Sequence, residues 1–213
     1  MFKARDHAAM LTDQSPPCQI SRSRSWVASS ETSDVNLIEA IAAGDTAAMQ
    51  VLFARHNVQV YRFALRRLGN EVVAEDVVSD VFLDVWRQAG RFKGRSPVST
   101  WLLAIARHKA IAIARRSSTS LDDDAQDSIE DAADNPEAAL QKRQQGSILL
   151  DCFTNLSPAH REIIDLVYYH QKSIDEVAAI IRVPRNTVKT RMFYARQKLA
   201  QLLDAQGITT AVA

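Results

Sequence analysis

The sequence has few cysteines and no apolar run of membrane-spanning length. Its two cysteines, Cys18 and Cys152, are too few and too far apart for a disulfide framework or a zinc site. We expect Cys152 to be a buried thiol because apolar residues surround it at helical spacing; a redox role for the two thiols stays open. Lys3 and Arg5 precede no apolar core, so no signal peptide is indicated. With no segment near the roughly 20 apolar residues of a bilayer span, we expect a cytoplasmic protein without membrane insertion.

Patterns that support catalysis are also missing. The sequence has no metal-ligand cluster, no glycine-rich phosphate loop and no nucleophile with a plausible base among its five histidines. We therefore expect no catalytic residues, no bound metal and no cofactor. The chain is not predicted to be an enzyme.

Acidic residues are absent from two segments, although the whole chain has a net charge of only +1. Eight basic residues and no acid lie from Trp86 to Leu121, and six basic residues and no acid lie from Arg182 to Leu203. Eight acids and no base occupy the stretch from Leu121 to Ala138. Two basic blocks separated by an acidic tether indicate two DNA-binding modules on one chain.

Residues 173–199 have the pattern of a helix–turn–helix. Ser173 and Glu176 match a capping box, in which the two residues satisfy each other's backbone N–H groups. A short apolar helix follows, and Pro184 separates it from the next helix, whose first turn it pre-sets. The second helix is strongly basic, as in proteins that lay a helix in the DNA major groove. The alternative is an ordinary amphipathic helix pair with a solvated basic face.

The two faces of this second helix favour DNA binding. At about 100° per residue, Val188, Met192, Ala195 and Leu199 form one apolar stripe. Phe193 lies opposite, where an isolated amphipathic helix has no reason to place an aromatic ring. Beside amide, hydroxyl and amine groups, such a ring suits a base-reading surface. The residues expected to contact DNA here are Arg185, Asn186, Lys189, Thr190, Arg191, Phe193 and Arg196.

Helical periodicity runs through the rest of the chain, without strand signals or internal repeats. Residues 1–34 are polar and aperiodic, which predicts a disordered extension. Helical modules are predicted over 35–116 and 136–205, with Asn135-Pro136 beginning a helix, an acidic linker over 117–135 and a tail over 206–213. We therefore predict an all-α fold of two small helical domains joined by a flexible acidic linker.

Within the first module, Asp76, Asp80 and Asp84 recur every four residues beside a complete apolar stripe. Three carboxylates are thus expected along one exposed helix edge, at a cost of a few tenths of a kcal/mol per pair in an isolated helix. A solvated face and a docking edge for a basic partner explain them equally well on physical grounds. A basic loop over residues 91–95 and a helix opened by Ser96-Pro97 come next.

Two separated motifs together resemble the extracytoplasmic-function (ECF) group of bacterial sigma factors. Residues 75–87 resemble conserved region 2.2, and residues 92–107, which include Trp101-Leu102 and Ile105-Ala106-Arg107, resemble regions 2.3 and 2.4. Residues 156–162 lead into a segment similar to region 4. The likeness covers roughly residues 35–205. A helix–turn–helix alone is shared by many repressors, whereas both motifs on one chain are specific.

The resemblance implies an alternative sigma factor, which binds core RNA polymerase, recognises −35 and −10 promoter elements and promotes DNA strand opening. It implies that the helix with Asp76, Asp80 and Asp84 docks on polymerase, and that the helix–turn–helix reads the −35 element. The implied partners are core polymerase, promoter DNA and, commonly in this family, an anti-sigma factor. The −10 element needs a cationic groove and a small pocket for a flipped base. The residues expected there are Phe92, Lys93, Arg95, Ser96, Arg107 and His108.

The sequence departs from the family pattern at four positions. Arg182 replaces a small turn residue, often Gly, and a left-handed conformation there would cost about 1 kcal/mol or more, which a different turn would avoid. Asn186 replaces another frequent Gly. His108 and Ala112 stand where Asn and Asp are common, which leaves the −10 preference open.

A second function is compatible with the same helix–turn–helix. A stand-alone transcriptional regulator would use residues 35–116 as an effector module. It would bind duplex DNA without polymerase, usually as a dimer on a palindrome. A sigma factor should instead bind promoters well only together with core polymerase.

Overall fold

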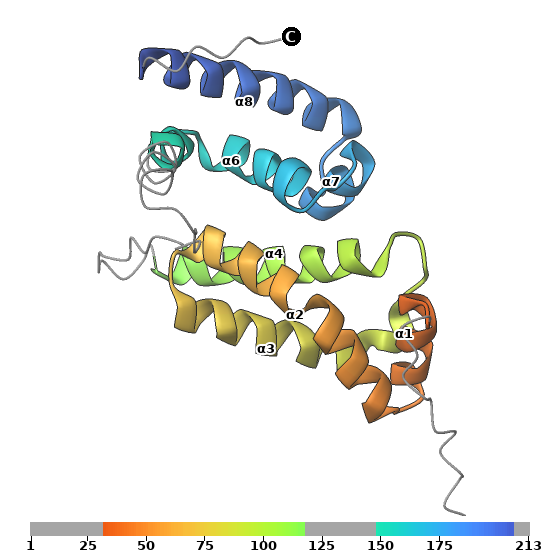
Figure 1. Cartoon of the computed structure of the whole chain (residues 1–213). Coiled ribbons are helices and arrows are strands. Elements are labelled where there is room, and N and C mark those ends of the chain that lie inside the picture. The colour runs from red at the N-terminus through yellow and green to blue at the C-terminus, as the bar shows by residue number, and fades with distance from the viewer. Residues whose placement is uncertain (1–31, 118–147, 207–213) are drawn as a thin grey trace, which may run out of the picture.

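The structure, a computed structural model, describes residues 32–117 and 148–206. Every regular element in these two ranges is a helix (Figure 1). The all-α fold predicted from the sequence is therefore confirmed. Residues 1–31 of the predicted N-terminal extension, nearly all of the acidic linker, the helix start at Asn135-Pro136 and most of the C-terminal tail lie outside the described residues. The prediction of disorder is wrong for the end of that extension, because Ser33 is the N-cap of a helix that begins at Asp34.

The first group of helices, here called the N-terminal bundle, spans residues 34–117. Its elements are α1 (Asp34–Ala42), α2 (Thr46–Leu68), α3 (Glu71–Gln88), the short 3₁₀ helix η1 (Ala89–Arg91) and α4 (Val98–Ser117). The side chains of Ser33, Asp45 and Asn70 accept backbone N–H groups at the starts of α1, α2 and α3, as N-cap residues do. Gly69 ends α2 in the left-handed conformation, which glycine adopts without strain.

The core of the N-terminal bundle lies between α2, α3 and α4. Val77, Val81 and Val85 are fully buried, so the apolar stripe of α3 faces inward as its spacing predicted. Phe53 of α2 packs edge-on against Phe82 of α3, with ring centroids 4.8 Å apart. This core fixes the exposed edge of α3 and the outer face of α4.

The second group of helices, here called the C-terminal bundle, spans residues 148–206. Residues 148–154 are helical, and α6 (Pro158–Ile164), the π-helical segment η2 (Asp165–Tyr169), α7 (Ile174–Ile181) and α8 (Arg185–Ala205) follow. The capping box of Ser173 and Glu176 is present at the start of α7, as the sequence predicted. Cys152 is buried, which confirms the expectation of an enclosed thiol.

The turn between α7 and α8 keeps a left-handed residue without glycine. Arg182 has φ 56° and ψ 47°, so the turn does not change to avoid the strain. Val183 N donates to Ala178 O across this turn, at 3.2 Å. Pro184 precedes α8 as its N-cap residue, one position earlier than the N1 position expected from the sequence. The helix–turn–helix geometry is therefore retained at an energetic cost to Arg182.

Replacing Arg182 with glycine is expected to stabilise the protein by about 0.5–1 kcal/mol, because glycine adopts this φ without the Cβ clash but loses more entropy on folding. Chemical denaturation of both proteins measures the difference. Arg182→Ala, which removes the guanidinium and keeps the Cβ, is the control and should give no such gain. An equal gain in both variants would assign the effect to the charge instead of the backbone.

The two bundles pack directly against each other. In Figure 1, α6 and α7 lie over α4, and α8 is the outermost helix of the C-terminal bundle. The most extensive packing between the bundles is that of α4 against α7. The outer surface of α8 is thus free, whereas one face of α4 is covered.

Candidate nucleic-acid and polymerase interfaces

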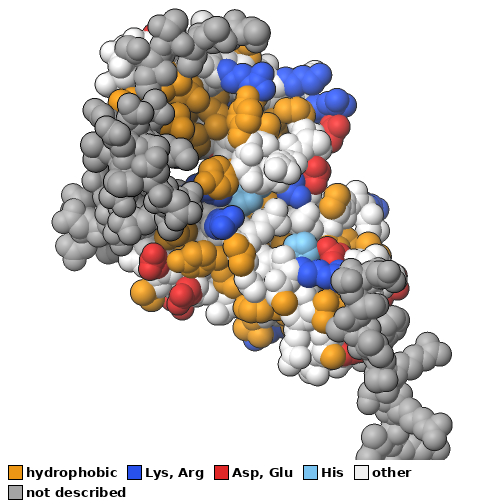
Figure 2. Space-filling model, viewed as in Figure 1, with side chains coloured by type: hydrophobic (Ala, Val, Ile, Leu, Met, Phe, Trp, Pro, Cys, Tyr) orange, Lys and Arg blue, Asp and Glu red, His pale blue; other side chains and the backbone are white. Residues whose placement is uncertain are grey.

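The exposed face of α8 carries the residues predicted to read DNA. Val188, Met192 and Ala195 are buried and Leu199 is half-buried, so the predicted apolar stripe packs inward. Figure 2 shows Lys and Arg side chains gathered along the rim of the molecule over α8. The predicted residues that lie exposed on this helix are Arg185, Asn186, Lys189, Thr190, Phe193 and Arg196, whereas Arg191 is half-buried.

Several of these side chains already have neighbours that limit their motion. Phe193 is 64% exposed and packs edge-on against Tyr194, with ring centroids 5.5 Å apart. The Thr190 hydroxyl donates to the Asn186 carbonyl at 3.0 Å. The Arg196 guanidinium lies 5.6 Å from the centre of the Tyr168 ring, in the range of a cation–π contact. The surface thus presents hydrogen-bond donors, acceptors and aromatic rings, several of them held by contacts within the chain.

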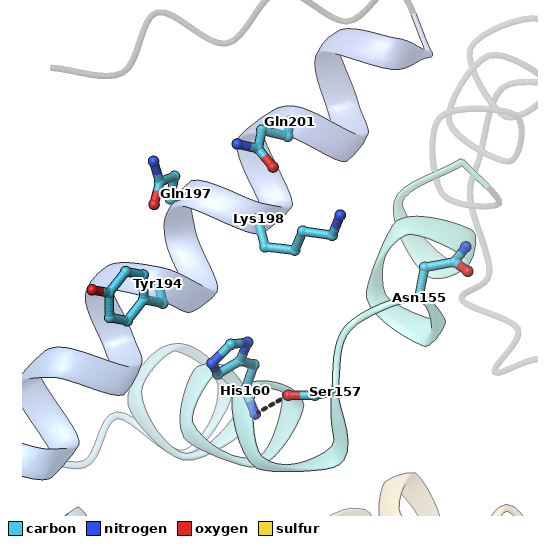
Figure 3. Close-up of a pocket in the computed structure, with 7 residues that line it drawn as sticks. All are labelled: Asn155, Ser157, His160, Tyr194, Gln197, Lys198 and Gln201. Carbon is cyan, nitrogen blue, oxygen red and sulfur yellow. Dashed lines mark hydrogen bonds between the residues drawn. The ribbon is translucent and has the colours of Figure 1, made fainter.

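An open hollow adjoins this face on the C-terminal side. It lies between α8 and the start of α6, and polar side chains line it, among them His160, Gln197 and Lys198 (Figure 3). Lys198 extends from α8 into the space beside Asn155, which directly follows the helix over residues 148–154. Because Gln197 follows Phe193 by one turn, the hollow continues the exposed face of α8 rather than forming a separate site.

The basic loop before α4 is built around an aromatic pair. Phe92 is half-buried against Trp101, with ring centroids 5.0 Å apart. Lys93 and Arg95 are exposed beside this pair, and Ser96 is half-buried. The half-buried Trp101 packs against the core instead of presenting a free stacking surface.

Arg107 lies apart from that loop, on the covered face of α4. It is nine residues into α4, so about 13 Å separate it from the start of the helix. Its Nε donates to Glu162 Oε1 at 2.8 Å, and its Nη2 donates to Glu162 Oε2 at 3.2 Å. His108, one position later, is exposed. The structure therefore brings the predicted loop residues together but gives Arg107 a partner in the C-terminal bundle.

The acidic edge of α3 is shorter than the sequence suggested. Asp76 is exposed, and the Asp80 side chain is 58% exposed. Lys109 of α4 places its Nζ 2.9 Å from Asp84 Oδ2 and 3.5 Å from Asp80 Oδ2. The expectation that all three carboxylates lie along an exposed edge is wrong for Asp84, which is half-buried because α3 packs on α4.

Sequence reasoning missed the polar residues that join the two bundles. Thr100 of α4, which is almost fully buried, donates through Oγ1 to Glu176 Oε1 at 2.6 Å. Lys172 Nζ donates to Ser99 Oγ at 2.6 Å and lies 3.4 Å from Glu176 Oε1. Three further arginines, described below, pair with carboxylates of the C-terminal bundle. The capping box accounts for Glu176 by its contact with Ser173 at the start of the same helix. Nothing in the sequence indicated its contact with Thr100 of the other bundle.

Glu176 is the group of this contact whose pKa is lowered in the folded protein. Burial by itself would raise its pKa, but hydrogen bonds from Thr100 and Ser173, together with the charge of Lys172, lower the pKa to about 2. A carboxyl group whose pKa is depressed by folding stabilises the folded state when ionised. Its contribution is present above about pH 4.5 and is lost as the pH falls toward about 2.

Glu176→Gln is therefore expected to lower the free energy of unfolding by about 1–3 kcal/mol near neutral pH, because the variant no longer has hydrogen bonds to a charged group. The difference from wild type should shrink as the pH falls below about 4.5. Denaturant unfolding across this pH range measures it. Asp175→Asn, at the exposed neighbouring residue, is the control. A deficit that stays constant with pH would contradict the ionised role of Glu176.

Neither a metal site nor a membrane span is found in the part of the chain that the structure describes. Residues 32–117 and 148–206 hold no group of three His, Cys, Asp or Glu side chains placed to bind a metal ion. Among the helices of these ranges, none combines the length and hydropathy that a bilayer span requires.

Comparison with known proteins places this architecture in a family. The Sigma-70 region 2 family matches residues 52–120, and the Sigma-70 region 4 family matches residues 152–201. The RNA polymerase sigma factor CarQ of Myxococcus xanthus is 31% identical, over 82% of this chain and 99% of CarQ. The ECF RNA polymerase sigma factor SigL of Mycobacterium tuberculosis is 29% identical, over 81% of this chain and 98% of SigL. The chain belongs to the ECF group of RNA polymerase sigma factors.

Solved structures share the fold. The structure of CnrH in complex with the cytosolic domain of CnrY is 28% identical and matches with a TM-score of 0.60, over 81% of this chain and 97% of that chain. The sigma factor RpoE in complex with the anti-sigma factor NepR, from Bartonella quintana, is 22% identical and matches with a TM-score of 0.58, over 71% of this chain and 94% of that chain. The chain is thus an alternative sigma factor, a transcription initiation factor that acts with core RNA polymerase.

Proposed function

We propose that the exposed face of α8 reads the −35 element and that the loop over residues 92–96 with α4 engages the −10 element. The observation that carries this proposal is the orientation of α8: its apolar stripe is buried, and Asn186, Lys189 and Phe193 face outward on the outermost helix. Exposed amide, amine and aromatic groups on one helix face match the donors and apolar contacts that read base edges in the major groove.

We also propose that Asp76 and Asp80 contact the core polymerase. Both remain exposed on α3, beside a buried stripe that fixes the helix in place. Asp84 has a smaller part in this surface because Lys109 already neutralises it. In this assignment the chain supplies promoter recognition and strand opening, and the polymerase performs the chemistry.

An anti-sigma factor is the further partner that we propose. CnrH, which has this fold, was solved with the cytosolic domain of CnrY bound to it. A protein partner on the same fold supports the idea that this chain is held inactive by a protein of comparable role. Co-purification of the chain with candidate partners, followed by loss of transcription on adding the partner, tests it.

Transcription in vitro tests the main proposal. Purified chain and core polymerase on genomic DNA fragments should give defined start sites preceded by two conserved elements, and core polymerase alone should not. A stand-alone helix–turn–helix regulator would bind duplex DNA by itself and would add no start sites to core polymerase. Failure to support any transcription would remove the proposal.

The orientation of α8 makes a prediction at single residues. Lys189→Ala should relax discrimination at particular −35 bases, because each good hydrogen bond to a base edge is worth about 1–3 kcal/mol of discrimination. Arg191→Ala should instead weaken all promoters alike, because the half-buried Arg191 lies at the margin of the face, where phosphates are contacted. A promoter-variant library read out by transcription measures both. A uniform loss with Lys189→Ala would mean that the helix lies differently in the groove.

A further inference from the structure

Three arginines of the N-terminal bundle meet two carboxylates of the C-terminal bundle. Arg66 and Arg67 lie in the last turn of α2, and Arg107 lies on α4. Arg67 Nη1 and Arg107 Nε both donate to Glu162 Oε1, each at 2.8 Å, and Arg107 Nη2 reaches Glu162 Oε2. Arg66 Nε lies 2.7 Å from Asp165 Oδ1. We call Arg66, Arg67 and Arg107 the arginine cluster.

The carboxylates are the more deeply buried partners. The side chains of Glu162 and Asp165 are 7% and 8% exposed, whereas the three arginine side chains are 16–24% exposed. An ionised carboxylate at such burial is costly unless charged hydrogen bonds compensate for the lost water. Glu162 obtains that compensation from two guanidinium groups, both on the other bundle. The pairing therefore depends on the two bundles being packed together.

Further side chains of the C-terminal bundle contact Arg66 of the arginine cluster. The Arg66 guanidinium lies over the Tyr169 ring, 3.3 Å from its centre, and its Nη2 is 3.5 Å from His170 Nε2. His170 Nε2 is in turn 3.4 Å from Asp165 Oδ2. Tyr169 is exposed on its outer side. Aromatic, imidazole and carboxylate groups of the C-terminal bundle thus surround cations of the N-terminal bundle.

The sequence explains why the carboxylates that pair with Arg107 come from the C-terminal bundle and not from its own helix. No acid lies between Trp86 and Leu121, so α4 and the loop before it contain no carboxylate for their own cations. A planar guanidinium that pairs bidentately with a carboxylate presents the same donors to a phosphodiester. Arg107 belongs to the helix that follows the basic loop, and Arg66 and Arg67 extend the cationic surface onto α2.

We propose that the arginine cluster is a binding site for the phosphates of single-stranded promoter DNA, and that Glu162 and Asp165 occupy it in the free protein. The assignment of the strand to promoter DNA rests on the proposed function. Glu162 and Asp165 stand where phosphate oxygens bind once the C-terminal bundle moves away. The free chain is therefore closed. Its apparent affinity for a single strand is the affinity of the open form multiplied by the fraction of molecules that are open.

The test uses the full chain without polymerase and two readouts. Opening is followed by energy transfer between dyes on Glu75→Cys and Gln201→Cys, in a Cys18→Ser background. Binding is followed with a fluorescent single-stranded oligonucleotide of mixed sequence, because phosphate contacts do not depend on sequence. Glu162→Gln keeps the shape of the side chain and removes its charge. It should lower energy transfer and raise affinity for the oligonucleotide about tenfold.

A second substitution separates opening from binding. Adding Arg67→Gln to Glu162→Gln should leave the molecule open and lower its affinity several-fold. Arg87→Gln, which removes an exposed charge of α3 in the same background, is the matched control and should lower affinity less. Asp204→Asn, at an exposed acid near the end of α8, controls for the added charge in the single variant.

Each outcome decides the proposal. Unchanged energy transfer in Glu162→Gln would show that the carboxylate does not hold the bundles together, and opening without a gain in affinity would remove the phosphate site. If Glu162→Gln is unfolded by circular dichroism, Thr100→Val replaces it, since it removes only the hydrogen bond to Glu176, and should give smaller changes in the same directions. A chain inactive with core polymerase would remove the proposed function and leave these readings unaffected.

Discussion

Asp80→Arg is expected to weaken assembly of the chain with core RNA polymerase by about tenfold to a hundredfold. Asp80 is exposed on α3, and reversing its charge would place like charges together across an interface with a basic partner. The fold should survive because the apolar stripe of α3 is untouched. Titration of labelled core polymerase with each variant measures the affinity, and circular dichroism reports on the helices.

The control for this experiment is a charge reversal elsewhere on the same helix. Glu75→Arg makes the same reversal of charge on an exposed residue that lies about 140° from Asp80 around the axis of α3. It should leave the affinity nearly as in wild type. Equal affinities of the Asp80→Arg protein and wild type would remove the docking role of this edge. Asp84→Ala is expected to act on stability more than on docking, because Asp84 pairs with Lys109.

Arg95→Ala is expected to lower open-complex formation about tenfold while changing initial promoter binding less. Arg95 is exposed in the loop beside the Phe92–Trp101 pair, where a parted strand has a cation and an aromatic pair within reach. Loss of a charged hydrogen bond to the strand accounts for an effect of this size. Permanganate reactivity of unpaired thymines measures opening, and filter binding at low temperature measures the initial complex.

Arg91→Ala provides the matched comparison for Arg95. Arg91 is another exposed arginine at the end of η1, four residues before Arg95 and outside the predicted −10 set. Its removal should affect opening less. Permanganate footprints of the Arg95→Ala holoenzyme identical to wild type would count against the strand-opening role. Arg107 is a less direct test of opening because its loss also releases Glu162.

Local sequence signals were enough to predict the orientation of α8. The spacing of Val188, Met192 and Ala195 fixed which face is buried, and Phe193 was correctly expected to lie outside. The capping box at Ser173 could be predicted from the sequence because its two members are only three residues apart. Features within one or two helical turns follow from periodicity and capping alone.

Contacts between segments that are distant in the chain could not be predicted from the sequence. Arg107 and Glu162 are 55 residues apart in the chain, and each has an ordinary local explanation, as a DNA-binding cation and as a helical surface acid. Lys109 neutralises Asp84 only because α4 packs across α3, which the four-residue spacing of the acids does not reveal. Arg182 retains a left-handed turn because the packing of α7 and α8 outweighs its local strain.

The π-helical segment η2 lets the length of the chain between Glu162 and the helix–turn–helix change by one residue at this place. In this segment His170 N donates to Asp165 O, five residues back, so one residue more is accommodated than in a regular α-helical turn. Deleting a single residue here would restore α-helical winding and leave Lys172 and the start of α7 facing Ser99 and Thr100, because the wide turn absorbs the extra residue. Deleting a residue within α7 would instead rotate all that follows in that helix by about 100° about the helix axis, because a regular α-helix has no wide turn to absorb the change. A one-residue gap at η2 in an aligned relative is therefore compatible with two bundles that meet through the same residues.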